Sequence, residues 1–366
     1  MTEPCFPALE EALLCLAVER AGLKSVHDCI IEEESLPIRQ SLSLLSHDIS
    51  RQAFFLSAWH PQTEKAEEQA LDYALLSLEA VSALAQRMEP GPVRQVLDFL
   101  LPEYLDALYR VANLLALRGT DPLSLTGGYS EIMPGRPLYT CRRSPVDGVE
   151  SALEGLSLWE EMALSILLSL EEEKTRFFQR AAAQESESLG RGLFLEMCLL
   201  SDQYAVEFAS LLPHRSGMAR LALNRYAACF LYASLAEAGG PSELVTFAEQ
   251  AEKNAIAQFQ SLLQFIPEQG GVFPEPPALP PLVFGRSKTY VRDILEKWGR
   301  GEQWNSESAG SVRYQKAVCP DPAQACSCQI IDEMIRRTGT DYRFEIAPHP
   351  IEALRDRTKS QRIPGA

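Results

Sequence analysis

One pentapeptide, LLSLE, occurs twice in the chain and ends at Glu79 in its first copy and at Glu171 in its second. Each copy lies in a segment whose apolar residues recur with the 3.6-residue period of an amphipathic helix. Each segment is followed by a polar break and a second helical pattern. The repeat therefore predicts two copies of one helical hairpin, and two paired hairpins form a four-helix bundle.

The two hairpins are expected over 62–117 and 149–212. In the first, the turn Glu89-Pro90-Gly91-Pro92 separates the helices, because proline lacks the backbone donor that a helix requires. A connection over 118–147, rich in Gly and Pro, joins the hairpins and is long enough to run the length of a helix. The fold class predicted is all-α, a four-helix bundle with a long crossover.

Additional helices are predicted on both sides of the bundle. Their periodic segments are 6–33, 37–59, 218–238, 241–266 and 288–298. This pattern indicates three regions: N-terminal helices over 1–61, the helical bundle over 62–266, and a Pro-rich linker with a C-terminal tail over 267–366.

The proline-rich segment 268–287 is expected to run extended over the bundle surface, because its prolines cannot join a hydrogen-bonded ladder. It holds more apolar side chains than a freely solvated linker would, and we expect several of them to be buried. They are Val272, Phe273, Leu279, Leu282, Val283 and Phe284.

Composition narrows the class of partner. The 366 residues are 46% hydrophobic and carry a net charge of −16, which argues against nucleic acid and an anionic membrane surface. No apolar run approaches the ~20 residues that span a bilayer, and the N-terminus lacks the basic start of a secretory signal. A cytoplasmic protein with a protein partner or a homo-oligomeric state is expected. Its nine cysteines are expected to be mostly reduced and buried.

A carboxylate at the same point of two paired hairpins is typical of a carboxylate-bridged two-metal site. Glu79 and Glu171 occupy that point, and the repeat predicts that they lie close together in the bundle centre. The alternative is that both carboxylates are paired with an arginine, a lysine or a tyrosine hydroxyl. A metal pair needs about four carboxylates and usually two imidazoles.

Three segments, 127–137, 190–212 and 220–237, resemble ferritin-like domain proteins of anaerobic bacteria, which are relatives of rubrerythrin. The resemblance covers roughly residues 60–265. It implies a ferritin-like bundle and, in a complete site, iron or manganese.

Metal ligands in such proteins include Glu-x-x-His on the second helix of each hairpin, and this chain departs from that motif. Ser201 stands in place of the glutamate and Tyr204 in place of the histidine, while the first hairpin offers Glu103 with Asp106. Further ligand positions of the family correspond to Asn224-Arg225 and 255–258. The metal candidates are Glu79, Glu103 and Glu171, with Asp106, Ser201, Tyr204 and Glu207 lining the site.

Two further groups of residues have ordinary interpretations. Cys319, Cys326 and Cys328 are expected to be free thiols, with a soft-metal site or a Cys319–Cys326 disulfide as alternatives. The acidic residues of the second hairpin are expected to form a solvated helix face; they are Glu160, Glu161, Glu172 and Glu173.

Three functions are consistent with the sequence. The leading one is a non-catalytic, vestigial ferritin-like protein that acts by protein binding or self-association. The second is a metal-dependent oxidoreductase or iron-handling protein with an atypical carboxylate site. The third is a subunit or cargo of a larger assembly that docks through its Pro-rich and Cys-bearing tail. On the leading interpretation, Ser201 and Tyr204 point into the core and hydrogen-bond the remaining carboxylates.

Overall fold

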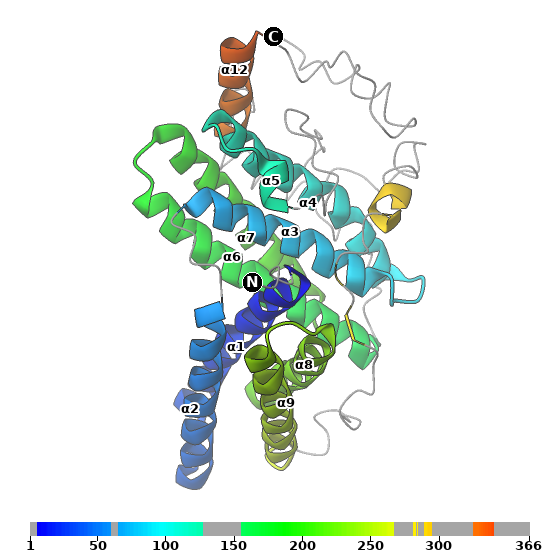
Figure 1. Ribbon diagram of the computed structural model, residues 1–366. Coiled ribbons are helices and arrows are strands. Elements are labelled where there is room, and N and C mark those ends of the chain that lie inside the picture. The colour runs from blue at the N-terminus through cyan, green and yellow to red at the C-terminus, as the bar shows by residue number, and fades with distance from the viewer. Residues whose placement is uncertain are drawn as a thin grey trace. The chain divides into compact units, whose positions relative to one another are not determined.

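The computed structural model describes residues 6–59, 65–126, 155–266, 281–282, 284, 289–294 and 325–339 (Figure 1). Within these ranges the chain is helical and contains no strand, as the all-α prediction requires. The helices are α1 (Phe6–Glu32), α2 (Leu36–Trp59), α3 (Ala66–Ala85), α4 (Pro92–Leu117), α5 (Pro122–Thr126), α6 (Leu158–Gln184), α7 (Ser188–Leu211), α8 (Gly217–Ala238), α9 (Ser242–Leu263) and α12 (Cys326–Thr338).

The predicted periodic segments and the observed helices agree closely. Residues 289–294 are helical, inside the helix predicted over 288–298, whose remaining residues lie outside the described part. The short α5 and the helix α12 were not predicted. Most of the crossover predicted over 118–147 also lies outside the described residues.

Local sequence explains where several helices begin and end. Pro92 is the first residue of α4, where its missing N–H costs no helical hydrogen bond. Ser216 caps α8, because its hydroxyl accepts a hydrogen bond from the backbone N–H of Ala219 at 3.3 Å. Gly339 ends α12 at a φ of 71°, a left-handed conformation that favours glycine.

The chain divides into two compact units. The first comprises 1–62, 153–173 and 204–283, and the second comprises 63–152, 174–203 and 284–366. Both α6 and α7 contribute residues to each unit. Division of the chain at residues 61 and 266 stays a prediction.

In the first unit, α1 packs against α2 and α8, and α8 packs against α9. Almost every side chain of α8 between Ala219 and Leu235 is buried, so this helix is central to the unit. Trp159 meets Phe230 edge-on at 5.3 Å between ring centroids, and Tyr226 lies 5.3 Å from Phe259. Burial of a large apolar side chain contributes about 1.5–3 kcal/mol, so each buried ring of these pairs stabilises the unit.

In the second unit, α3 packs against α4 and is buried on nearly every side from Leu71 to Ala85. Asp72 is the half-buried exception in that stretch. Desolvation, together with the nearby carboxylate of Glu68, raises the pKa of Asp72 to about 7.

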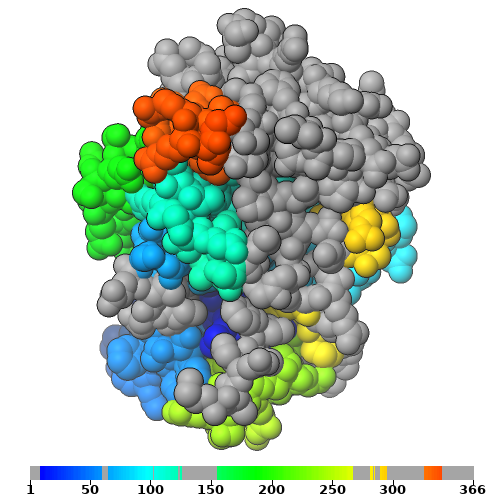
Figure 2. Space-filling model, turned by 45° about the horizontal axis from the view of Figure 1, so that its top comes forward, coloured from blue at the N-terminus to red at the C-terminus, as the bar shows by residue number. Residues whose placement is uncertain are grey.

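Helix α12 belongs to the second unit and packs against α4, as the orange and teal surfaces show in Figure 2. The Glu196 carboxylate of α7 accepts hydrogen bonds from the backbone N–H groups of Cys326 and Ser327, the first two residues of α12. A carboxylate at this end complements the helix dipole. Arg337 near the other end donates to the Leu117 carbonyl at 3.1 Å.

The Pro-rich segment is described only in part. Leu282 and Phe284 are buried, with 3% and 6% of their surface exposed, which confirms the expectation for these two residues. The Leu282 N–H donates to the Ser234 hydroxyl at 2.7 Å. The other four apolar residues of the prediction lie outside the described part.

Gly192 of α7 provides a direct test of how α12 is attached. A Cβ at this position would overlap the Cys326 sulfur, so only glycine allows the observed approach. We expect Gly192→Ala to detach or shift α12, seen as faster amide hydrogen exchange over 326–338. Adding Cys326→Gly, which removes the sulfur and also the Cβ that would lie 2.9 Å away, should restore most of the protection. Unchanged exchange in Gly192→Ala would contradict the observed packing.

Candidate functional site

The three candidate metal ligands are all buried. Glu79 is 2% exposed in α3, Glu103 is 8% exposed in α4, and Glu171 is fully buried in α6. Glu79 and Glu103 belong to the second unit and Glu171 to the first. The predicted approach of Glu79 to Glu171 joins the two units and stays a prediction.

An arginine lies beside the acidic residues of α4. Arg110 donates from Nε and Nη2 to one oxygen of Asp106, at 2.8 and 2.6 Å, and its Nη1 lies 3.8 Å from Glu196. Burial alone lowers the pKa of Arg110, but Asp106, Glu196 and then Glu103 outweigh it and raise that pKa above its ordinary value. Asp106 is therefore held by an internal cation.

The other site-lining candidates also face the interior. Ser201, Tyr204 and Glu207 are 2%, 6% and 8% exposed. Tyr204 is therefore turned away from solvent. Its alignment with the histidine of the family motif requires this, because that histidine faces the interior. The hydrogen bonds expected from Ser201 and Tyr204 to the remaining carboxylates stay a prediction.

Within the described residues, no three His, Cys, Asp or Glu side chains are grouped so that they could hold a metal ion. The binding of iron or manganese, which the family resemblance implies, stays a prediction.

One ion pair with no exposed surface was not predicted. Glu19 of α1 and Arg225 of α8 are both 0% exposed, and Arg225 Nη1 donates to Glu19 Oε2 at 2.8 Å. Tyr232, about two turns further along α8, donates to the other Glu19 oxygen at 2.7 Å. Both carboxylate oxygens of Glu19 are thereby hydrogen-bonded, as a buried charge requires.

Asn224 fixes the orientation of the arginine. Its amide oxygen accepts from Arg225 Nη2 at 2.6 Å and from Nε at 3.1 Å, while its amide nitrogen donates to the Val18 carbonyl at 2.9 Å. Gly22 of α1 makes room for this group, since a Cβ there would lie 2.5 Å from both Arg225 and Asn224. The sequence signal was the polar pair Asn224-Arg225 inside a mostly apolar helix.

Electrostatics keep the neighbouring groups protonated. Burial, reinforced by the negative charge of Glu19, raises the pKa of the Tyr232 phenol well above its usual range. Burial, followed by the charges of Glu11 and Glu19, also raises the pKa of the Cys15 thiol. Tyr232 therefore acts as a hydrogen-bond donor, and Cys15 is a poor nucleophile.

The expectation of a solvated acidic face on α6 is wrong for two residues. Glu161 is 4% exposed and both of its oxygens accept from Arg215, each at 2.7 Å. Glu173 is fully buried and forms an ion pair with Arg20 of α1. Both arginines come from other parts of the chain, so the sequence of α6 alone could not predict these ion pairs.

Thiol chemistry is restrained in the described residues. Cys15, Cys29, Cys198 and Cys229 are free and buried, and Cys326 and Cys328 are half-buried thiols. Burial chiefly raises the pKa of Cys29 to about 11 and that of Cys229 to about 12. Cys319 lies outside the described part.

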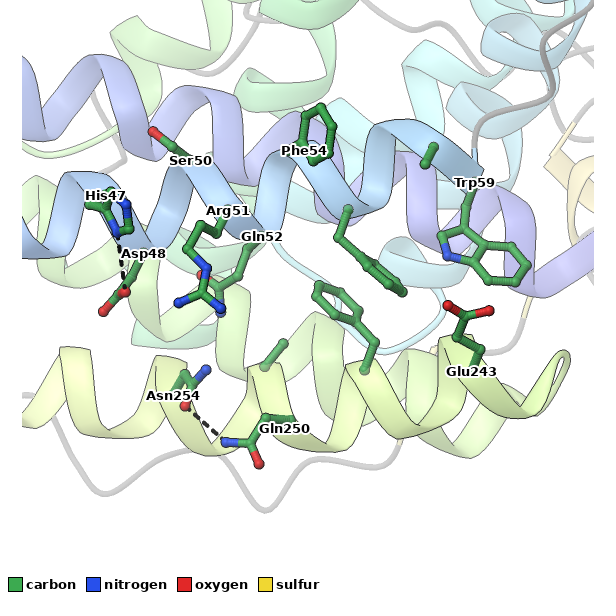
Figure 3. Close-up of a pocket in the computed structure, with 14 residues that line it drawn as sticks. His47, Asp48, Ser50, Arg51, Gln52, Phe54, Trp59, Glu243, Gln250 and Asn254 are labelled. Carbon is green, nitrogen blue, oxygen red and sulfur yellow. Dashed lines mark hydrogen bonds and ion pairs between the residues drawn. The ribbon is translucent and has the colours of Figure 1, made fainter.

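A groove separates α2 from α9 in the first unit, where the two helices run antiparallel (Figure 3). Its volume is about 990 Å³. Phe55 and Phe247 stack across it with ring centroids 3.9 Å apart. Gln52 is 5% exposed, and neither its amide oxygen nor its amide nitrogen has a hydrogen-bond partner among the described residues.

No described helix is both long and apolar enough to cross a membrane. Comparisons of the chain with protein-family models, with curated proteins and with solved structures gave no match. The resemblance to ferritin-like proteins therefore depends on the sequence segments quoted above.

The ion pair between Glu19 and Arg225 can be tested by mutation. We expect Arg225→Met to lower the free energy of unfolding by about 3–5 kcal/mol, because Glu19 is left buried without its cation. Combining Glu19→Gln with Arg225→Met should recover part of that loss. The measurement is urea denaturation, with Arg220→Met at an exposed position of the same helix as control. Additive effects in the double variant would contradict direct coupling.

Proposed function

We propose that the chain is a non-catalytic protein with a ferritin-like scaffold, and that it acts by binding a protein partner. The observation that carries the first part is the buried Glu19–Arg225 ion pair. Asn224-Arg225 corresponds to a position where the family pattern places metal ligands. Here that position supplies a guanidinium, which is a fixed positive charge.

The same arrangement recurs in the second unit, where Arg110 binds Asp106. A divalent ion placed beside either arginine would be repelled, and the carboxylate would have to exchange one cation for another. Arginine also satisfies a carboxylate with directed hydrogen bonds, so no metal is needed to neutralise it. This supports a scaffold in which metal binding has been replaced by internal ion pairs.

The turn between α1 and α2 supports the second part. Ile31 and Leu36 are 79% and 64% exposed, and they flank the acidic residues Glu32 and Glu34. Within the described residues, Glu32 and Glu34 form no ion pair. We call Ile31, Glu32, Glu34 and Leu36 the hairpin tip. Exposed apolar side chains bordered by free negative charge suit a basic amphipathic segment of another protein. A second copy of a chain with net charge −16 is a poorer match.

Metal analysis tests the first part. We expect protein purified under anaerobic and under aerobic conditions to hold iron and manganese far below one ion per chain. Changing Glu79 and Glu171 together to Gln should leave that content unchanged, as should the control Glu172→Gln, whose partner is the exposed Lys24. Near-stoichiometric metal that is lost only in the Glu79 and Glu171 double variant would overturn the proposal.

The hairpin tip is tested with a fluorescent amphipathic peptide of Lys and Leu, with a Glu and Leu peptide as control. We expect the basic peptide to bind and its affinity to fall with salt. Replacing Ile31 and Leu36 by Lys should weaken binding by about tenfold, roughly 1.4 kcal/mol. The matched control is Val206→Lys, at another apolar position that is 64% exposed. Equal anisotropy curves for all three proteins would refute the hairpin tip as a binding surface.

A further inference from the structure

Gln52 is the unexplained polar group of the groove between α2 and α9. Buried amides nearly always find hydrogen-bond partners, so a buried amide with both atoms unpartnered requires an explanation. Only 5% of the Gln52 surface is exposed, and neither polar atom of its amide has a hydrogen-bond partner among the described residues. The side chain is directed from α2 toward α9 in Figure 3. Its carboxamide presents one donor group and one acceptor side by side.

The groove around this amide has aromatic walls. Phe55 and Phe247 form a stacked pair, and Trp59 lies near one end with Glu243 opposite it (Figure 3). Because the two phenylalanine rings stack on one another, a planar ring in the groove would meet them at their edges, an edge-to-face arrangement that aromatic pairs favour. The volume of about 990 Å³ is at the upper end of the range of small-molecule sites, roughly 300–1,000 Å³.

Charge differs between the two ends of the groove. Arg51 is exposed next to Gln52 and forms no ion pair within the described residues, whereas Glu243 places a carboxylate near Trp59. The remaining titratable side chains of the groove, His47 and Asp48, lie 4.0 Å apart between Nδ1 and Oδ1. An anionic group of a ligand would therefore be held by Arg51, because a guanidinium binds phosphate with two parallel hydrogen bonds.

We propose that this groove binds an adenine nucleotide. A glutamine carboxamide pairs with adenine through two hydrogen bonds, to N6 and N7, and these would satisfy both atoms of Gln52. The base would lie against the aromatic walls, and the phosphate would meet Arg51. Because the Gln52 amide is covered in this structure, binding requires a side chain at the rim, such as the exposed Arg51, to change rotamer.

The site is distinct from the hairpin tip. It uses residues 47–59 of α2 and 243–254 of α9, whereas the hairpin tip uses residues 31–36. Loss of peptide binding and loss of nucleotide binding are therefore separate results.

The test is isothermal titration of the full chain with adenosine 5′-monophosphate and with adenosine. We expect one saturable site per chain for the monophosphate. Gln52→Leu should weaken binding of both compounds by about tenfold or more. Leucine cannot make the two hydrogen bonds to the adenine base, which both compounds contain. Arg51→Ala should weaken the monophosphate but leave adenosine within about twofold, since only the phosphate reaches the guanidinium.

Gln250→Leu is the matched control, because Gln250 lines the same groove but is exposed and donates to Asn254 at 3.0 Å. It should leave both affinities unchanged. Without ligand, Gln52→Leu should raise the melting temperature, since it removes an unsatisfied buried amide. The proposal is overturned if the monophosphate shows no saturable binding at millimolar concentration, or if Gln52→Leu binds it as tightly as the unaltered chain. Equal loss of both compounds in Arg51→Ala would overturn the phosphate contact.

Discussion

The ion pair between Glu19 and Arg225 sets the packing of the first unit. Two opposite charges with no exposed surface can persist only if each is hydrogen-bonded, and here Tyr232, Asn224 and the two charges satisfy one another. Most of these partners lie on α1 and α8, and Arg225 Nη1 also donates to the Gln258 side-chain oxygen of α9 at 3.5 Å, so these hydrogen bonds hold the helices in one register. The packing of α2 and α9 follows, since α2 contacts α1 and α9 contacts α8.

The second unit also contains a buried arginine that is paired with a carboxylate, and fewer residues take part. Arg110 is held by Asp106 one turn earlier on α4 and lies 3.8 Å from Glu196 of α7. Glu196 in turn accepts hydrogen bonds from the first residues of α12. A chain of polar contacts therefore links an internal arginine to the attachment of a helix that lies more than a hundred residues away in sequence. In both units an arginine forms the ion pair, Arg225 with Glu19 and Arg110 with Asp106.

Periodicity predicted the helices because it is a local property of the sequence. It did not predict the ion pairs, because Glu19 lies 206 residues from Arg225 and Glu173 lies 153 residues from Arg20. For the same reason Glu161 and Glu173 looked solvated. Helix α12 was overlooked since it is only 13 residues long and lies in a polar tail. The groove could not be predicted from the sequence either, because it is formed by two helices that are nearly 200 residues apart.

Anomalous diffraction from crystals grown with Mn²⁺ would show whether arginines take the place of metal beside these carboxylates. We expect electron density for the Arg225 and Arg110 guanidinium groups against Glu19 and Asp106, and no manganese peak beside these carboxylates, or beside Glu79, Glu103 or Glu171. A manganese peak coordinated by any of these carboxylates, with the arginine side chain turned away, would contradict this expectation.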